Sequence, residues 1–184
     1  MTPLTIPCER ITLIIFTPDY AELVVEFYTA NRAHLESWEP KRAEAFYELE
    51  ETRKRLSGSE AAFHAGTGFS FGLIDNQTGK LAGMCNFSNI VRGVFQACHL
   101  GFAVSASHQG KGIMYEGLQA AIGYMFDTVG LHRIMANHLP HNERSAKLLK
   151  RLGFEKEGYA KSYLKINGIW QDHILNALVS TKDS

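Results

Sequence analysis

The chain has 184 residues, 45% of them hydrophobic and 11% aromatic, which suits one domain with a substantial core and excludes a disordered chain. Its 19 basic and 19 acidic residues balance, so no whole-molecule field would draw it onto nucleic acid or anionic lipid. We therefore expect a single domain over residues 1–184 that binds neither nucleic acid nor membranes directly.

The periodicity of apolar residues predicts alternating strands and helices. In chain order we expect a strand at 10–17, helices at 18–31 and 42–64, strands at 69–74, 81–87 and 97–104, a helix at 112–129, a strand at 133–137, a helix at 142–151 and a strand pair between 153 and 179. The helix at 112–129 has the clearest apolar face. Its members are Met114, Leu118, Ala121, Ile122, Met125 and Val129. This order predicts an α/β arrangement with a mixed sheet.

Location and redox state follow from shorter features. The longest apolar stretches, such as 11–16, are far shorter than the roughly 20 residues of a membrane helix. The N-terminal residues lack the basic start and apolar run of a secretory signal, so we expect a cytosolic protein. Cys8, Cys85 and Cys98 show no Cys-x-x-Cys spacing, and reduced core thiols fit them better than a disulfide frame or a metal site.

Residues 104–114 lead from the strand at 97–104 directly into the best helix of the chain. Gly110 and Gly112 can adopt backbone angles closed to other residues, so successive N–H groups can converge on an anion. The helix behind them adds unpaired N–H groups and a positive dipole end. A pyrophosphate would fit there, although spacing alone leaves open a tight turn whose glycines are steric.

Two other phosphate-binding motifs are excluded at this loop. A Walker loop would require glycine at Ser105 and Ser or Thr at Gly112, so ATP is disfavoured. The dinucleotide fingerprint Gly-x-Gly-x-x-Gly fails because Tyr115 replaces its final glycine.

The stretch Gln109-Gly110-Lys111-Gly112 resembles the Gln/Arg-x-x-Gly-x-Gly/Ala signature of GNAT acetyltransferases, with Met114 departing at the last position. Downstream, Asn142-Glu143-Arg144-Ser145 and Leu152-Gly153-Phe154 resemble the Asn-x-x-Ser helix and Leu-Gly-Phe exit of that family. Four segments are also similar to the RimJ/RimL branch of ribosomal-protein N-acetyltransferases, especially its alanine-specific members. They are 38–40, 86–89, 132–137 and 152–161.

The resemblance implies the GNAT fold, with a mixed, mostly antiparallel sheet of about six to seven strands flanked by helices. It also implies acetyl-CoA as cosubstrate, with backbone amides on its pyrophosphate, the strand before the loop along its pantetheine arm, and no metal. The positions it assigns to cofactor binding are Phe102, Ala103, Val104, Gln109, Gly110, Lys111, Gly112, Ile113, Met114, Asn142 and Ser145. Many relatives carry a catalytic tyrosine where Leu149 stands here, so Ser145 becomes the candidate for protonating the thiolate.

A general base is harder to assign. Relatives of the RimL type carry a carboxylate where Leu164 stands, so no base transfers to that position. Glu39 is another candidate for the general base, and the alternative is that it is an ordinary solvated glutamate. Glu116 is similarly doubtful as a base, because helix stability alone favours an acidic residue in the first turn. An α-amine, with a pKa near 7.8, needs only a weak base or water.

Several features bear on partners. Residues 36–60 carry seven acidic and five basic side chains and could meet a basic protein surface, with solvated helix faces as the alternative. Residues 131–165 carry eight basic and three acidic side chains, which would suit the 3′-phosphate of coenzyme A. Trp38, Tyr163 and Trp170 could line a peptide groove or be buried. The four histidines considered as metal ligands lack a third ligand at recognisable spacing. They are His99, His132, His138 and His141.

The resemblance implies an acceptor, the N-terminal alanine of a small-subunit ribosomal protein or its N-terminal peptide. Two alternatives stay open at this stage. One is an acetyltransferase acting on a small-molecule amine such as an aminoglycoside or polyamine. The other is a non-catalytic domain that binds coenzyme A and assists ribosome assembly.

Overall fold

The computed structural model describes residues 4–181. The strands are β1 (Thr5–Pro7), β2 (Ile11–Ile15), β3 (Phe69–Asp75), β4 (Leu81–Val91), β5 (Ala97–Val104), β6 (Arg133–His138), β7 (Glu155–Ile166) and β8 (Ile169–Val179). The helices are α1 (Ala21–Ala30), α2 (Arg32–Leu35), α3 (Leu49–Ala65), α4 (Ile113–Asp127) and α5 (Glu143–Arg151), with short 3-10 turns η1 (Pro18–Tyr20), η2 (Glu44–Tyr47) and η3 (Ala106–His108).

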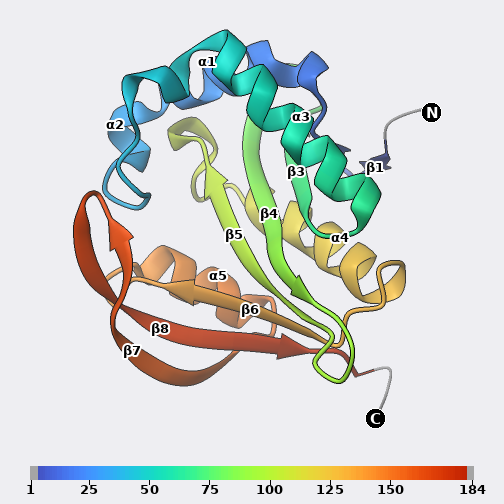
Figure 1. The fold of residues 1–184 in the computed structure, drawn as a ribbon, viewed down its shortest axis with the longest axis vertical. Coiled ribbons are helices and arrows are strands. Elements are labelled where there is room, and N and C mark those ends of the chain that lie inside the picture. Colours follow the sequence, from blue (N-terminus) through green and yellow to red (C-terminus); the bar gives the residue numbers. More distant parts are fainter. Residues whose placement is uncertain (1–3, 182–184) are drawn as a thin grey trace.

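All eight strands form one sheet in the order β1-β2-β3-β4-β5-β6-β8-β7. Neighbouring strands of the described chain run antiparallel except β5 and β6, which are parallel. The mixed, mostly antiparallel α/β sheet is therefore confirmed, and Figure 1 shows its two halves diverging between β5 and β6.

Two details of the predicted architecture are wrong. The sheet has eight strands instead of six to seven, because residues 5–7 pair with β2 in a segment too short for a periodic signal. The second helix begins at Leu49 instead of residue 42. Residues 44–47 form η2, and Glu48 then adopts an extended conformation that separates the turn from the helix.

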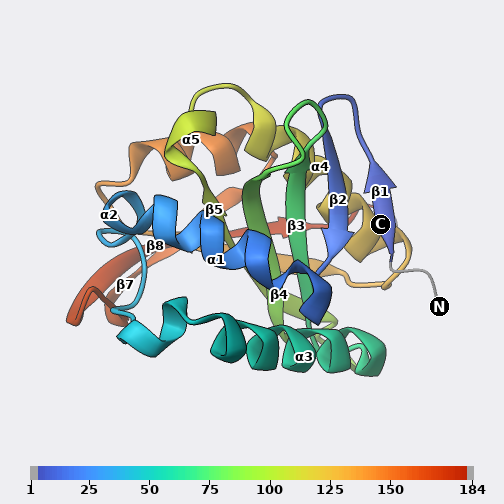
Figure 2. The same ribbon diagram turned by 90° about the horizontal axis from the view of Figure 1, so that it is seen from above.

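Helices cover both faces of the sheet, with α1 and α3 on one face and α4 and α5 on the other (Figure 2). On the first face, Val24 and Phe27 of α1 pack with Leu56 of α3 in one apolar cluster. On the second, Leu118 and Met125 of α4 are fully buried in the larger cluster. Burial of these side chains is the main favourable term holding the helices against the sheet.

The position of α4 is fixed by a close approach to β3. A Cβ on Gly117 would lie 2.4 Å from Leu73 Cδ2, so only glycine lets the helix axis come this near the sheet. The predicted apolar face is confirmed, since its members from Met114 to Met125 are buried and Val129 packs at the edge of the same cluster. This packing places the N-terminus of α4 at the end of β5.

Within residues 4–181, no helix is long and apolar enough to span a bilayer.

Candidate active site

The two central strands part at the middle of the sheet. β5 and β6 pair from Ala97↔Arg133 to Leu100↔Ala136, and their pairing then stops. Beyond this point residues 101–104 still pair with β4 on one side, but the register gives them no strand partner on the other. Backbone N–H and C=O groups on such an edge require hydrogen-bond partners. The opening therefore offers a free strand edge to an extended, amide-containing molecule.

The loop after β5 presents a row of N–H groups. Gly110 and Gly112 have φ of +71° and +76°, the left-handed region that the sequence predicted for them. The backbone N–H groups of residues 110–115 find no acceptor within residues 4–181. They lie at the N-terminus of α4, where the helix dipole favours an anion.

Arg10 ties this loop to the start of β2. Its Nη1 donates to the Lys111 carbonyl at 2.7 Å, while its Nε and backbone N donate to the two carboxylate oxygens of Glu116 at 2.8 and 2.7 Å. Burial raises the pKa of the Glu116 carboxyl, but the hydrogen bonds and charge of Arg10 outweigh it and lower that pKa overall. Glu116 is thus an ionised anchor of the loop. Arg10 escaped sequence analysis because it lies 106 residues from its partner.

Two further contacts fix the first part of the loop. Asn31, at the end of α1, accepts a hydrogen bond from the Ala106 N–H at 2.8 Å. His108 Nε2 donates to Asp75 at 3.0 Å, and its Nδ1 lies 2.6 Å from the Ser105 hydroxyl. The hydrogen bond from His108 lowers the pKa of the Asp75 carboxyl. These residues form a Ser-His-Asp chain, but Ser105 is only 5% exposed, so its hydroxyl serves the loop and not a substrate.

Gln109 connects the two sides of the opening. Its Nε2 lies 3.1 Å from His34 Nε2 on α2, and its Oε1 accepts a hydrogen bond from Arg144 on α5. His34 Nε2 also lies 3.2 Å from the Val104 carbonyl at the end of β5. Gln109, the first residue of the signature, therefore contacts α2 on one side of the opening and α5 on the other. Its position in the motif did not reveal these contacts.

Asn142 caps α5, as the sequence predicted. Its Oδ1 accepts a hydrogen bond from the Ser145 N–H at 3.1 Å. The half-buried Ser145 hydroxyl makes no hydrogen bond to the described residues, so it is available to a ligand. Leu149, one turn further along, is buried in the apolar core and leaves Ser145 as the hydroxyl of this helix.

The two positions considered for a general base, Glu39 and Leu164, differ in character. Glu39 pairs with Arg42 at 3.4 Å, and burial raises the pKa of its carboxyl despite this arginine. Leu164 is 45% exposed, so an apolar side chain occupies the position at which RimL-type relatives carry a carboxylate. Tyr163, beside it, has its hydroxyl 3.4 Å from Asn137 Nδ2 at the end of β6.

The remaining candidates separate into different environments. Trp38 and Trp170 are both exposed, and the Trp38 ring lies 5.6 Å from that of His141. His99 is partly buried, which lowers its pKa, and its Nδ1 has no hydrogen-bond partner. No three His, Cys, Asp or Glu side chains within the described chain are grouped as metal ligands. All three cysteines are free thiols.

Comparison with known proteins gives concordant relatives. The chain is 49% identical over 157 residues to the [ribosomal protein uS5]-alanine N-acetyltransferase of Escherichia coli, covering 85% of this chain and 81% of the relative. Among solved structures, it superposes on the ribosomal-protein-S5-alanine acetyltransferase of Vibrio fischeri with a TM-score of 0.94. That pair shares 38% identity over 97% of this chain and 98% of the other.

A second solved structure, Mycobacterium smegmatis RimJ in complex with CoA-disulfide, gives a TM-score of 0.90 at 28% identity. The match covers 97% of this chain and 88% of the Mycobacterium smegmatis chain. The sequence also matches the acetyltransferase (GNAT) domain family over residues 10–155, a span that contains β5, the loop, α4 and α5. The chain therefore belongs to the GNAT acetyltransferase family and is an N-acetyltransferase.

Proposed function

We propose that this enzyme transfers the acetyl group of acetyl-CoA to the α-amine of the N-terminal alanine of ribosomal protein uS5. The relative from Escherichia coli, which carries that activity in its name, supports the acceptor. The observation that carries the cofactor side is the row of unpaired N–H groups at residues 110–115, next to the free edge of β5. The row of N–H groups fits a diphosphate, and the free edge of β5 fits an extended amide chain.

We assign the two ends of the coenzyme accordingly. The N–H groups of Gly110 to Met114 would hold the pyrophosphate, next to Gln109, whose own N–H donates to the Ala106 carbonyl, and the backbone of Phe102, Ala103 and Val104 would pair with the pantetheine amides. Asn142 and Ser145 lie at the N-terminus of α5, on the other wall of the opening. Together these residues account for a bound coenzyme without a metal ligand.

Acetyl-CoA supplies an activated acyl carbon, and the chain supplies position and a proton. An α-amine with a pKa near 7.8 becomes neutral at cytosolic pH for about half a kcal/mol, whereas a lysine amine requires about 4 kcal/mol. The neutral amine forms the new C–N bond as the C–S bond breaks. The Ser145 hydroxyl donates a proton to the sulfur and regains one from the amine through water, so that amide and thiol form with no net change in protons.

We also treat the whole chain as one acetyltransferase domain and place the reaction in the cytosol. The single sheet running from Thr5 to Val179 supports one domain, since it begins before the matched family segment and ends after it. An acceptor that is itself a cytosolic ribosomal protein supports the location.

Intact-mass analysis of uS5 after incubation with acetyl-CoA and this enzyme tests the proposal. We expect one acetyl group, located by fragmentation on the N-terminal alanine. Polyamines and aminoglycosides, offered in the same assay, should be poor acceptors, and uS5 with a blocked N-terminus should remain unmodified. Acetylation confined to the small amines, or to lysine side chains of uS5, would contradict the assignment.

A further inference from the structure

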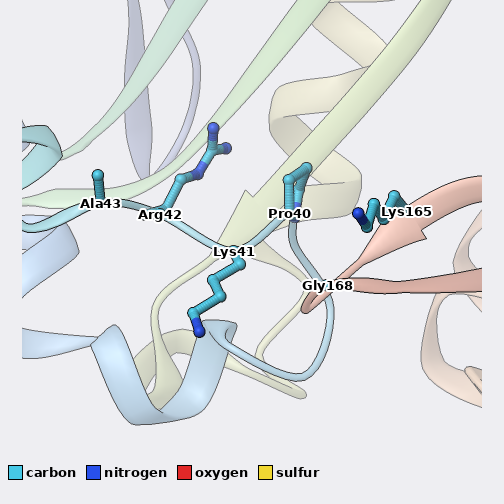
Figure 3. Close-up of a pocket in the computed structure, with 6 residues that line it drawn as sticks. All are labelled: Pro40, Lys41, Arg42, Ala43, Lys165 and Gly168. Carbon is cyan, nitrogen blue, oxygen red and sulfur yellow. The ribbon is translucent and has the colours of Figure 1, made fainter.

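An open cavity of about 530 Å³ lies between the loop after α2 and the tip of the β7–β8 hairpin. Pro40, Lys41, Arg42 and Ala43 form one wall, and Lys165 with Gly168 forms the other (Figure 3). The walls are joined where the Asn167 N–H donates to the Glu39 carbonyl at 2.9 Å. The cavity is therefore a feature of two segments far apart in sequence.

The residues that line the cavity carry net positive charge. Three of the six are basic and none is acidic, although Lys41 and Arg42 also line an adjoining pocket with Glu36, Glu39 and Glu44. Arg42 is occupied by Glu39 at 3.4 Å and by the Phe46 ring at 4.5 Å, and its side chain points away from the hairpin in Figure 3. Lys41 and Lys165 are exposed and have no carboxylate partner within the part of the chain that the structure describes. In Figure 3 the Lys165 side chain extends toward Pro40, whereas the Lys41 side chain extends from the other side of the loop, so both ammonium groups meet one anion only when the flexible Lys41 stem turns toward the hairpin.

The cavity also lies beside the route to the β5–β6 opening. The loop continues from α2, whose His34 contacts the Val104 carbonyl at the end of β5. The hairpin continues from β7, where Tyr163 lies 3.4 Å from Asn137 on β6. The two walls of the cavity are therefore extensions of the two walls of the opening. A polypeptide whose terminal amine enters the opening would run past Lys41 and Lys165.

We propose that this cavity binds a carboxylate side chain of the acceptor polypeptide, downstream of its N-terminal amine, through Lys41 and Lys165. The inference rests on the proposed function, since it assigns a specificity site for the same acceptor. Lysine suits this role because its flexible stem carries a point charge that pairs with a carboxylate without strict geometry. The apolar faces of Pro40 and Ala43 can contact the methylene groups of a glutamate.

A peptide series tests the site. Each peptide begins with alanine and carries one glutamate, moved from the second to the eighth position, and a matched peptide has glutamine there. For the wild type we expect kcat/KM to favour glutamate about fivefold at one position or two adjacent positions, through KM, because exposed ion pairs contribute modestly. The preference should fade as salt is raised.

The double variant Lys41→Gln, Lys165→Gln should bring the glutamate-to-glutamine ratio close to one. Lys161→Gln, an exposed lysine of the same hairpin outside the cavity, is the matched control and should keep the wild-type ratio. Acetylation without any glutamate preference, or a preference that survives the double variant, would overturn the site alone. Failure to acetylate any peptide on its α-amine would overturn the proposed function and the site together.

Discussion

The loop at residues 105–112 and the walls of the acceptor cavity are built in opposite ways. Three distant segments hold the loop, through Arg10, Asn31 and the Asp75–His108 pair. The cavity walls meet through one described backbone hydrogen bond from Asn167, and they present two exposed lysines. A cosubstrate common to a whole family calls for a preorganised site, whereas acceptor choice can vary on exposed loops. The difference matches the two tasks proposed here, cosubstrate binding at the loop and acceptor choice at the cavity.

Gly112→Glu should have the largest effect, and it should weaken acetyl-CoA binding without changing acceptor binding. The new carboxylate would compete with the diphosphate, at a residue whose φ of +76° already disfavours a side chain. We expect acetyl-CoA affinity to fall by more than about 100-fold, measured by calorimetry. Gly110→Ala is the control for backbone strain without a new charge: its φ is +71°, a Cβ would meet no atom within 4 Å, and the substitution should cost far less affinity. Unchanged affinity in Gly112→Glu would contradict the assigned anion site.

Ser145→Ala tests whether the Ser145 hydroxyl protonates the sulfur of coenzyme A. The helix cap should survive, because Asn142 accepts from the Ser145 backbone N–H and not from its side chain. We expect kcat to fall by about 100-fold, the lower end of the range for loss of a general acid, with a far smaller change in acetyl-CoA affinity. Single-turnover kinetics with saturating acetyl-CoA would measure this. An unaltered chemical step would show that another group, or water, protonates the thiolate.

Arg10→Ala should loosen the loop without touching the acceptor side. It removes the side-chain bonds to Lys111 and Glu116 and keeps the backbone N–H bond to Glu116, and we expect KM for acetyl-CoA to rise about tenfold while kcat and the acceptor KM stay near wild type. Glu116→Gln keeps one acceptor for Arg10 and should have a smaller effect. Because the pKa of Glu116 is lowered in the folded state, its contribution to folding stability is fully present above its unfolded pKa. That contribution is lost as pH falls through the folded pKa. A raised acceptor KM in either variant would contradict the separation of the two regions.

Glu39→Gln should have the smallest effect if Glu39 is structural. We expect kcat to change by less than about twofold, since an α-amine needs little base. The raised pKa of this carboxyl means that its protonated form is favoured in the folded state. Its contribution to stability therefore declines as pH rises from about 4.3 through the raised value, and the variant should flatten that part of the stability profile. A loss of 100-fold in kcat would instead identify Glu39 as the general base.

Sequence periodicity predicted the elements that position the cofactor side. The predicted strand at 97–104 coincides with β5, and the predicted apolar face of residues 112–129 is the buried face of α4. The Asn142 cap was also readable, because capping is a local interaction between residues three apart. These features depend on short-range preferences, which a single sequence records.

Other features depend on tertiary contacts that no local pattern encodes. Arg10 meets Glu116 across 106 residues, and His108 meets Asp75 across 33. The strand at 5–7 is defined by its pairing with β2 and not by its own alternation. Lys41 and Lys165 form one cavity only because the hairpin tip folds back onto the loop after α2.

The most direct test is an amide NMR titration of the enzyme with coenzyme A and, separately, with pantetheine, which lacks the diphosphate. We predict that coenzyme A shifts the backbone amide resonances of residues 110–114 and that pantetheine leaves them in place, while residues 102–104 respond to both. Saturating coenzyme A that leaves residues 110–114 unchanged and shifts amides elsewhere would contradict the central claim.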